Sequence, residues 1–357
     1  MSEKIGVGVI GCGAGRFHAY RYAAMPDVEL VALAGLDQDR CREIARQCDI
    51  PRIYRDYTEL LAQPDIDGVS ICVPNHLHAP MTMAALEAGK HVLVEKPLAT
   101  SVAEGEAMAE AAARTSRVLM VVFNYRFRED SQTLKRHVEA GNLGRIYFIR
   151  AGWLRHEGIP GGAEGWFTDK ARSGGGCLID LGVHMLDLAL WLTGKPRVLS
   201  VTAATYAALG PRGLGLFPGR RFQGKITRFD VEDFVAALLR LESGATLALE
   251  VSWAGYTKPG DRFFVHLWGE ESGAELDVLN YVREDTLTFY RDVKGTRAEI
   301  QPKLQGEEEK SINSEFIRAI RQGQAVSPTV DEGLQILRII EAIYRSAAEG
   351  REVQLEV

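Results

Sequence analysis

The chain has 357 residues, of which 46% are hydrophobic and 25% charged, and its formal net charge is −6 at pH 7. These values are typical of a soluble globular protein that is long enough for two domains, each with its own core. The acidic balance, and a sequence without any basic stripe, argue against nucleic acid as a partner.

The cysteines and the start of the chain bear on the cellular compartment. The five cysteines are odd in number and show no C-x-x-C spacing, which favours free thiols in a reducing cytosol and gives no zinc signature. No signal peptide precedes the first strand pattern, and no apolar run approaches ~18 residues. We therefore expect a cytoplasmic protein with no membrane-spanning helix, no membrane partner and no metal.

The first residues follow the pattern of a nucleotide-binding unit. Ile5 to Ile10 is an apolar run that predicts a buried strand, and a helical pattern runs from Arg16 to Met25. Between them lies a glycine loop of the kind that brings backbone N–H groups onto a pyrophosphate at a helix N-terminus. The fingerprint is imperfect, because the third glycine comes one residue early. We expect the cofactor to contact Gly11, Gly13, Ala14, Gly15 and Arg16.

An acidic residue follows the second predicted strand, Val28 to Leu33. Asp37 comes about 20 residues after Gly15, the distance at which a carboxylate binds the adenosine ribose hydroxyls. A carboxylate there repels a 2′-phosphate, so NAD is favoured over NADP. The alternative is that Asp37 only caps a helix that starts near Asp39.

Further strands and helices alternate along the chain. Strands are predicted at 67–73, 91–94 and 118–123, and helices at 79–89 and 102–114. Short connections between alternating elements predict a parallel sheet with right-handed crossovers. Polar residues follow three successive strands at the edge where such sheets bind ligands. These residues are Pro74 and Asn75, then Glu95, Lys96 and Pro97, then Asn124 and Arg126.

A later segment, 174–192, predicts a helix with an unusual polar stripe. At helical spacing Asp180, His184, Asp187 and Trp191 share one face, and the opposite stripe is apolar. Three glycines at 174–176 allow close approach to the backbone. We expect the helix to present Asp180 and His184 to a substrate as a proton-transfer pair.

From residue 142 onward most predicted elements are strands. They lie at 146–153, 198–206, 231–241, 245–253 and 263–268, with a hairpin turn near Gly244. This pattern predicts a distinct α+β domain with a mostly antiparallel sheet, and one free face of that sheet suggests association with another subunit.

The motifs are recognisable as a set. They are Val73-Pro-Asn75 with His78, the run from Ala84 to Leu98, Asn124 to Phe127, Gly174 to Gly176 with Asp180, His184 and Asp187, Val231 to Phe234, Glu250 to Trp253, and Glu341 to Tyr344. This set closely resembles the Gfo/Idh/MocA family of NAD(P)-dependent oxidoreductases over essentially the whole chain. Two departures stand out: His18 follows Gly11 one residue earlier than the family's histidine, and Arg128 replaces a frequent proline.

The resemblance implies an α/β architecture. Residues 1–123 would form a Rossmann dinucleotide-binding domain with a doubly wound parallel sheet. Residues 124–357 would form a C-terminal domain with a large open sheet, which binds substrate and builds homodimers or homotetramers. Family members interconvert a secondary alcohol and a ketone on a sugar, cyclitol or sugar derivative. They often have a cis peptide before the proline that matches Pro97.

The resemblance also assigns roles around the reacting carbon. His184 would act as acid/base, because the ordinary imidazole pKa of ~6.5 suits proton transfer near neutral pH. Lys96 would polarise the reacting oxygen. Asp180 would bind a neighbouring hydroxyl or orient the imidazole, and Asp187 is the alternative for orientation. We expect cofactor contacts from Gly11, Gly13, Ala14, Gly15, Arg16, Asp37, Pro74, Asn75, His78, Glu95, Lys96 and Asn124, and substrate contacts from Lys96, Arg126, Asp180 and His184.

Two other functions remain open. One is an NAD-dependent glycosidase that works by transient oxidation and shows no net cofactor turnover. The other is a non-catalytic NAD-binding regulator, against which the retained Lys96 and His184 argue.

Overall fold

The computed structural model describes residues 4–160, 165–216, 228–304, 310–324 and 327–355. The chain forms two compact units. The first contains residues 1–122 and 310–337, and the second contains 123–309 and 338–357. The sequence prediction placed the boundary after residue 123 and the whole C-terminal part in the second domain. In the structure Lys310–Leu337 groups with the first unit instead.

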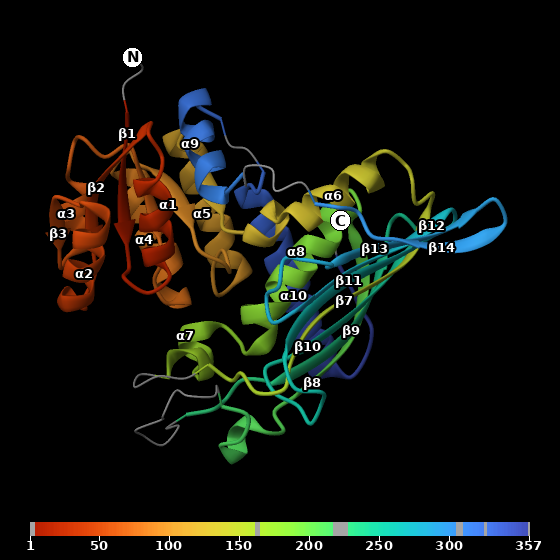
Figure 1. The fold of residues 1–357 in the computed structure, drawn as a ribbon. Helices are drawn as coiled ribbons and strands as arrows, with labels where there is room; N and C mark the ends of the chain where they lie inside the picture. The colour runs from red at the N-terminus through yellow and green to blue at the C-terminus, as the bar shows by residue number, and fades with distance from the viewer. Residues whose placement is uncertain (1–3, 161–164, 217–227, 305–309, 325–326, 356–357) are drawn as a thin grey trace. The chain divides into compact units, whose positions relative to one another are not determined.

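The first unit contains a six-stranded parallel sheet in the order β3-β2-β1-β4-β5-β6 (Figure 1). This order is that of the doubly wound nucleotide-binding fold, which confirms the predicted fold class. The strands are β1 (Ile5–Ile10), β2 (Val28–Ala34), β3 (Arg52–Tyr54), β4 (Gly68–Ile71), β5 (His91–Val94) and β6 (Leu119–Val121). The helices are α1 (Gly15–Ala23), α2 (Gln38–Cys48), α3 (Tyr57–Leu61), α4 (His78–Glu87), α5 (Val102–Thr115), α9 (Ile312–Gln322) and the first part of α10 (Val330–Glu349), and a 3₁₀ turn, η1 (Asn75–Leu77), precedes α4.

The sequence explains these elements directly. β5 and nearly all of β1 are buried, as central strands of a parallel sheet are. The C-terminal helix α9 packs against β4, where a Cβ added to Gly68 would lie 2.9 Å from the Ile320 side chain and 3.1 Å from that of Phe316. Glycine at this position therefore lets a segment from the far end of the chain complete the first unit.

Two of the five cysteines are paired. Cys12, in the glycine loop, and Cys41, on α2, form a disulfide with their Cα atoms 5.9 Å apart. The prediction of free thiols is wrong at these positions, because sequence spacing does not reveal that α2 passes beside the loop. Cys48, Cys72 and Cys177 are free and buried. The thiol argument no longer supports a cytoplasmic location, which stays a prediction.

The second unit contains a nine-stranded sheet in the order β14-β13-β12-β11-β7-β10-β9-β8-β15. All neighbours are antiparallel except β7 and β10, so the expected mostly antiparallel sheet is confirmed. The strands are β7 (Ile146–Arg155), β8 (Val198–Tyr206), β9 (Phe234–Leu241), β10 (Thr246–Ser252), β11 (Asp261–Gly269), β12 (Ser272–Leu279), β13 (Leu287–Val293), β14 (Thr296–Ile300) and β15 (Val353–Gln354). The last four were not predicted.

Helices cover one face of this sheet (Figure 1). They include α6 (Glu129–Glu139) and α8 (Val183–Leu192), and shorter pieces are the 3₁₀ turns η2 (Asn124–Phe127), η3 (Trp166–Thr168) and η5 (Gly210–Arg212), α7 (Lys170–Ser173) and a π-helical turn, η4 (Leu178–Gly182). The covered face contributes fully buried side chains such as Leu249 and Phe263. On the opposite face Leu238 is 44% exposed.

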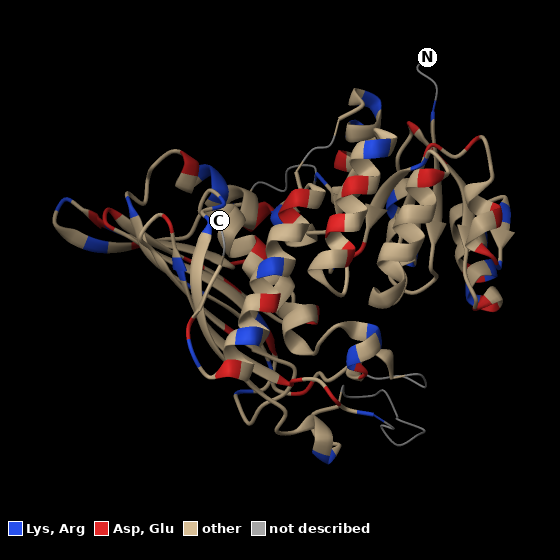
Figure 2. Ribbon diagram, turned by 180° about the vertical axis from the view of Figure 1, so that it is seen from behind, with Lys and Arg blue, Asp and Glu red and all other residues tan. Residues whose placement is uncertain are grey.

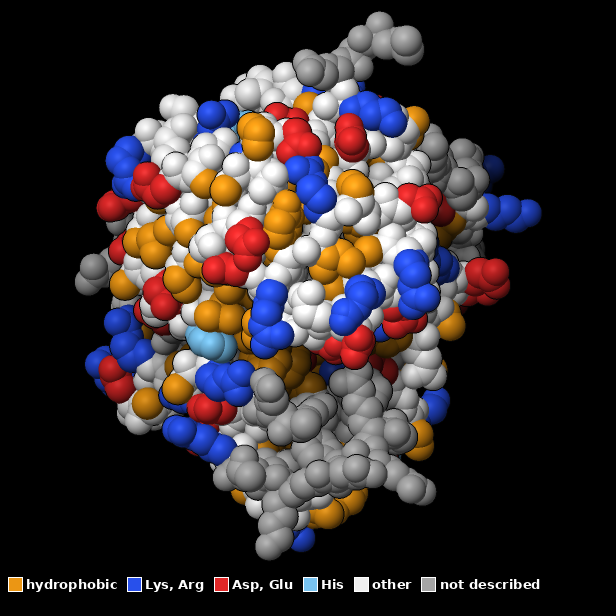
Figure 3. Space-filling view, turned by 90° about the vertical axis from the view of Figure 1, so that its left-hand side faces the viewer, with side chains coloured by type: hydrophobic (Ala, Val, Ile, Leu, Met, Phe, Trp, Pro, Cys, Tyr) orange, Lys and Arg blue, Asp and Glu red, His pale blue; other side chains and the backbone are white. Residues whose placement is uncertain are grey.

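One helical stretch in the described part of the chain, Lys170–Leu192, is long and apolar enough to span a membrane by length and composition. The sequence prediction did not anticipate it. However, 89% of its most apolar window is buried inside the protein, as is usual for the core helix of a soluble protein. Figure 2 shows Lys and Arg interspersed with Asp and Glu along the ribbon, and Figure 3 shows apolar side chains scattered among charged ones on the side of α2 and α3.

Candidate active site

The glycine loop between β1 and α1 is shaped for close backbone approach. Gly11 has φ +103°, and a Cβ there would lie 2.1 Å from the backbone oxygen of Cys72. A Cβ on Gly13 would meet no atom within 4 Å. α1 begins at Gly15, and its N-cap residue Ala14 makes no side-chain capping bond. The N-terminus of α1 is thus open to an anionic group, which fits the pyrophosphate of a dinucleotide.

Asp37 caps the N-terminus of α2, the role that the sequence left open as the alternative to ribose binding. Its carboxylate accepts the backbone N–H of Arg40 at 3.1 Å, at the start of α2. The residue is exposed and a carboxylate has several acceptor sites, so a contact with ribose hydroxyls is compatible with the cap. Its cofactor contact stays a prediction.

The loops after β4 and β5 are tied together by His78. Its Nδ1 lies 2.7 Å from the Pro97 carbonyl oxygen and its Nε2 2.9 Å from that of Val73. Burial lowers the pKa of His78, and the hydrogen bonds to the two carbonyls oppose this shift. The Lys96–Pro97 peptide is cis, as expected. Asn75 is buried in η1, directly after Pro74.

Glu95 is held from two sides. Its Oε1 lies 3.2 Å from Nε2 of His18 on α1, and its Oε2 accepts the backbone N–H of Lys96 at 3.2 Å. His18 therefore reaches Glu95 despite its altered spacing in the sequence. His18, Cys72 and Glu95 present possible metal-ligand atoms within 4.8 Å of one another. Burial raises the pKa of the Cys72 thiol well above its usual range, which disfavours the thiolate that a metal requires.

The segment that carries the predicted proton-transfer pair is not one regular helix. Asp180 lies in the π-helical turn η4, and His184 lies in the first turn of α8. A π-helical turn holds more residues than an α-helical turn, so the N-terminal end of the predicted polar stripe departs from regular α-helical spacing. Asp180 is half-buried and His184 is buried.

The glycines before this segment serve internal packing. A Cβ on Gly175 would lie 2.0 Å from the Tyr344 hydroxyl, and one on Gly176 would lie 1.9 Å from the backbone oxygen of Glu232. The buried Glu232 carboxylate accepts the N–H groups of Gly176 and Leu178 and the Tyr344 hydroxyl, each at 3.0 Å. The group that approaches these glycines closely therefore belongs to the protein itself.

Aromatic and charged side chains surround the pair. The indole N–H of Trp253 donates to Asp180 Oδ2 at 2.9 Å. The His184 ring lies edge-on to Tyr125, with centroids 4.9 Å apart, and 5.8 Å from the Trp153 ring. Burial alone would lower the pKa of Arg155, but Asp180 and Asp261 outweigh it and raise that pKa. Asp180 thus lies in the field of a buried cation.

Arg126 and Asp187 form a buried ion pair. Nε of Arg126 donates to Asp187 Oδ2 at 2.9 Å, and a second guanidinium nitrogen donates to the other oxygen. The side chains are 4% and 2% exposed. The predicted substrate contact of Arg126 stays a prediction, as does the cofactor contact of Asn124, which lies beside it in η2.

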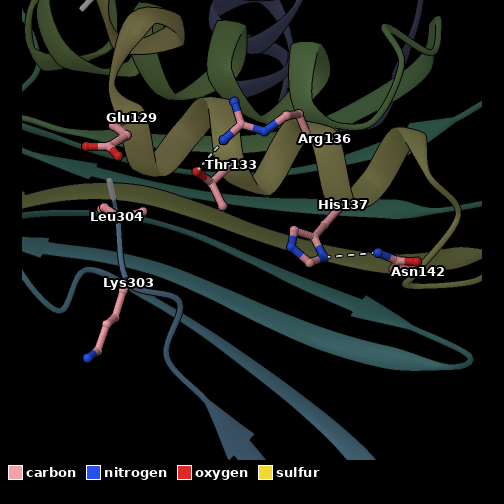
Figure 4. A pocket seen from close by; sticks show the side chains of 7 residues that line it. All are labelled: Glu129, Thr133, Arg136, His137, Asn142, Lys303 and Leu304. Carbon is pink, nitrogen blue, oxygen red and sulfur yellow. Dashed lines mark hydrogen bonds between the residues drawn. The ribbon is translucent and has the colours of Figure 1, made fainter. Parts of the chain in front are cut away.

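A separate cavity of about 320 Å³ lies in the second unit between α6 and the segment after β14 (Figure 4). Figure 4 shows the His137 ring and the Asn142 amide pointing toward each other, with a hydrogen bond of 3.0 Å. None of the predicted site residues lines this cavity; its lining is Glu129, Thr133, Arg136, His137, Asn142, Lys303 and Leu304. The cavity is therefore separate from the candidate site, which we keep at the residues predicted from the sequence.

Several neighbours of the pair were not predicted. Trp153 and Arg155 lie on β7. The alternation of this segment predicts a strand, but it does not show which side chains face the segment that carries Asp180 and His184. Tyr125 and Trp253 belong to motifs noted in the sequence, and that membership was the only available signal. Glu232 belongs to the motif Val231 to Phe234, and that membership was its signal in the sequence.

Comparison with known proteins agrees with this geometry. A sequence profile described as the oxidoreductase family with an NAD-binding Rossmann fold matches residues 5–123, and the GFO/IDH/MocA C-terminal domain matches residues 131–272. The chain is 31% identical to the D-glucoside 3-dehydrogenase of Escherichia coli (strain K12), with 99% of this chain and 98% of that protein covered. It is also 31% identical to the levoglucosan dehydrogenase of Pseudarthrobacter phenanthrenivorans, with 97% of each covered.

Solved structures give the same result. A levoglucosan dehydrogenase in complex with NADH and levoglucosan superposes with a TM-score of 0.86 at 28% identity, over 99% of this chain and 100% of that one. An aldose-aldose oxidoreductase from Caulobacter crescentus gives a TM-score of 0.81 at 29% identity, over 99% and 100%. The chain therefore belongs to the Gfo/Idh/MocA family of oxidoreductases, and NAD is its cofactor.

Proposed function

We propose that this protein is an NAD(H)-dependent dehydrogenase that interconverts a secondary alcohol and a ketone on a sugar, cyclitol or sugar derivative. The relatives that cover almost the whole chain are named glucoside and levoglucosan dehydrogenases, and one neighbouring structure contains NADH and levoglucosan. The observation that carries the proposal is the placement of Asp180 and His184 on successive turns of one buried segment, in a chain with an NAD-binding fold.

The first unit would bind the cofactor. The glycine loop and the N-terminus of α1 would bind the pyrophosphate, and Asp37 the adenosine ribose. Asn75 and Glu95 would hold the nicotinamide ribose. Bound NAD accepts or donates a hydride at the reacting carbon.

The second unit would bring the acid/base group to the substrate. In the oxidative direction His184 takes the hydroxyl proton, and the Tyr125 and Trp153 rings limit the water around its imidazole. Lys96 donates to the same oxygen and stabilises its negative charge. Asp180, oriented by the indole of Trp253, accepts a hydrogen bond from a neighbouring substrate hydroxyl.

The test follows NADH absorbance over a panel of alkyl glucosides, levoglucosan and inositols. His184→Ala should lower kcat/KM by about 10²–10⁴-fold while NADH binding, followed by fluorescence titration, is retained. His137→Ala is the matched control, since its imidazole lies in the separate cavity of Figure 4. Unchanged turnover in His184→Ala would overturn the assigned mechanism.

Adding aryl glycosides to this panel separates the two alternatives. Release of an aglycone from aryl glycosides without net NADH would favour an NAD-dependent glycosidase. Tight NADH binding without turnover of any sugar or release of any aglycone would favour a non-catalytic regulator.

We also propose that the protein forms homodimers or homotetramers through the face of the nine-stranded sheet that lies opposite its helices. This face carries Phe148 and Trp268 with ring centroids 5.2 Å apart, and Leu238 is 44% exposed on the same face. Exposed apolar side chains on a large sheet favour burial against a second copy. Leu238→Glu should shift the mass measured by light scattering toward the monomer, and an unchanged mass would contradict this interface.

A further inference from the structure

A buried polar network in the first unit joins α9 to Glu95. Asn313 on α9 is completely buried, and its amide nitrogen lies 3.0 Å from Nδ1 of His18. The hydroxyl of Ser70 lies 3.2 Å from the same nitrogen and 2.8 Å from the Tyr22 hydroxyl. The other ring nitrogen of His18 faces Glu95. The network therefore runs from the C-terminal part of the chain to the residue before Lys96.

The donors in this network can be assigned. Nη1 of Arg21 lies 3.4 Å from Oδ1 of Asn313, and because a guanidinium only donates, the atom facing it is the amide oxygen. The amide NH₂ consequently faces His18. An NH₂ group only donates, so Nδ1 of His18 must accept and carries no proton. The single ring proton lies on Nε2, which donates to Glu95 Oε1 at 3.2 Å.

We propose that Asn313 is a positioning residue that holds His18 as the neutral Nε2–H tautomer, so that Glu95 keeps its negative charge and its orientation beside Lys96. A doubly protonated His18 would place an N–H against the Asn313 NH₂ group. The positive charge of Arg21, on the far side of the amide, also opposes an imidazolium, whereas Glu95 favours one.

The remaining groups that face His18 do not reverse this balance. Tyr22 and Cys72 are neutral, because burial raises the pKa of the Tyr22 hydroxyl and of the Cys72 thiol. Glu95 therefore receives a hydrogen bond from a neutral His18 ring. The catalytic consequence, a carboxylate charge next to Lys96, rests on the proposed function, whereas the tautomer itself does not.

The direct test observes the ring nitrogens of His18 in ¹⁵N-histidine-labelled full-length protein, since proton-bearing and unprotonated ring nitrogens have well-separated shifts. The chain has eight histidines, and the His18 signals are assigned by their loss in His18→Gln. We expect Nδ1 to carry no proton and Nε2 to carry one at neutral pH, as the contacts of the two nitrogens require. A proton on Nδ1 in the wild type at neutral pH would overturn the proposal.

Two variants test the role of Asn313. Asn313→Asp keeps the size but accepts where the amide donated, so both ring nitrogens should carry protons at neutral pH. Gln322→Glu is the matched control, because it adds the same charge at an exposed position on α9. Asn313→Leu removes the donor and should allow a proton on Nδ1, which the Ser70 hydroxyl can accept. An unchanged ring state in both Asn313 variants would contradict the proposal.

Catalysis supplies the second measurement. With any sugar that the wild type oxidises, Asn313→Asp should move the acidic limb of the kcat/KM profile up by about one pH unit or more, because an imidazolium then neutralises Glu95. A purely structural role would lower thermal stability and leave this limb in place, which would overturn the proposal. If the wild type oxidises no sugar, the proposed function fails, and the ring-nitrogen measurement still decides this inference.

Discussion

The Glu232→Ala variant tests how the site is held in the second unit. The substitution removes an acceptor from three groups: the N–H of Gly176, the N–H of Leu178 and the hydroxyl of Tyr344. Each buried donor left without a partner costs about 1–3 kcal/mol, so the loss for the three donors should be about 3–9 kcal/mol. That is a large part of the roughly 5–15 kcal/mol by which a domain is stable.

Urea unfolding followed by tryptophan fluorescence measures this loss in the second unit alone, because all five tryptophans lie there. They are Trp153, Trp166, Trp191, Trp253 and Trp268. Glu242→Ala is the control: it removes an exposed carboxylate that is paired with Arg197. Glu232→Gln, which keeps one acceptor oxygen, should lose only about 1 kcal/mol. If Glu232→Ala unfolds at the same urea concentration as Glu242→Ala, the reasoning is refuted.

The pH dependence of the urea unfolding transition is a second test of the role of Glu232. Burial raises the pKa of Glu232 above its ordinary value, so the folded second unit binds a proton more readily than the unfolded chain. The contribution of this carboxyl to stability is complete below the ordinary pKa and is lost as the pH rises through the raised one. The advantage of wild type over Glu232→Gln should therefore shrink with rising pH.

Two further predictions concern buried charge. Asp187→Asn leaves the Arg126 guanidinium buried without its anion, which should destabilise the second unit by about 3–5 kcal/mol in the same urea assay, whereas Asp292→Asn, at an exposed pair, should have little effect. In the first unit, burial and the charge of Arg117 lower the pKa of His91 to about 4, and its Nδ1 accepts the backbone N–H of Val118 at 3.0 Å. Because the folded pKa is depressed, this stability is complete above pH ~6.5 and is lost as the pH falls through about 4. Hydrogen exchange of first-unit peptides should show a loss of about 3 kcal/mol that His91→Gln lacks.

The sequence predicted those parts of the fold that depend on local patterns. Strand β5 has the predicted bounds, 91–94, because an apolar run between turn residues defines a buried central strand. The glycine loop was located for the same reason, since strand, glycines and helix follow one another within 20 residues. In contrast, β14 has mostly exposed side chains, and β13 buries only Leu287 and Phe289 in its first half, so local patterns mark these strands weakly.

The features that sequence reasoning missed are contacts between distant segments. The return of Lys310–Leu337 to the first unit depends on the space that Gly68 leaves for α9. The disulfide depends on α2 passing beside the glycine loop. No property of Cys12 or Cys41 in the sequence distinguishes them from the free cysteines. Spacing rules describe neighbours along a helix or strand and carry no information about such pairings.

Two carboxylates that the sequence left equivalent, Asp180 and Asp187, have different partners in the structure. Helical spacing placed Asp180 and Asp187 on one face with His184, and either one was a candidate to orient the imidazole. In the structure the buried Arg126 lies against Asp187 and offsets its charge. Asp180 accepts the indole N–H of Trp253, which orients the carboxylate, and it lies in the field of the buried Arg155. Glu232 fixes the backbone just before the π-helical turn that carries Asp180. Because Asp187 is 2% exposed and Asp180 only half-buried, we propose Asp180 as the carboxylate that accepts a hydrogen bond from a substrate hydroxyl.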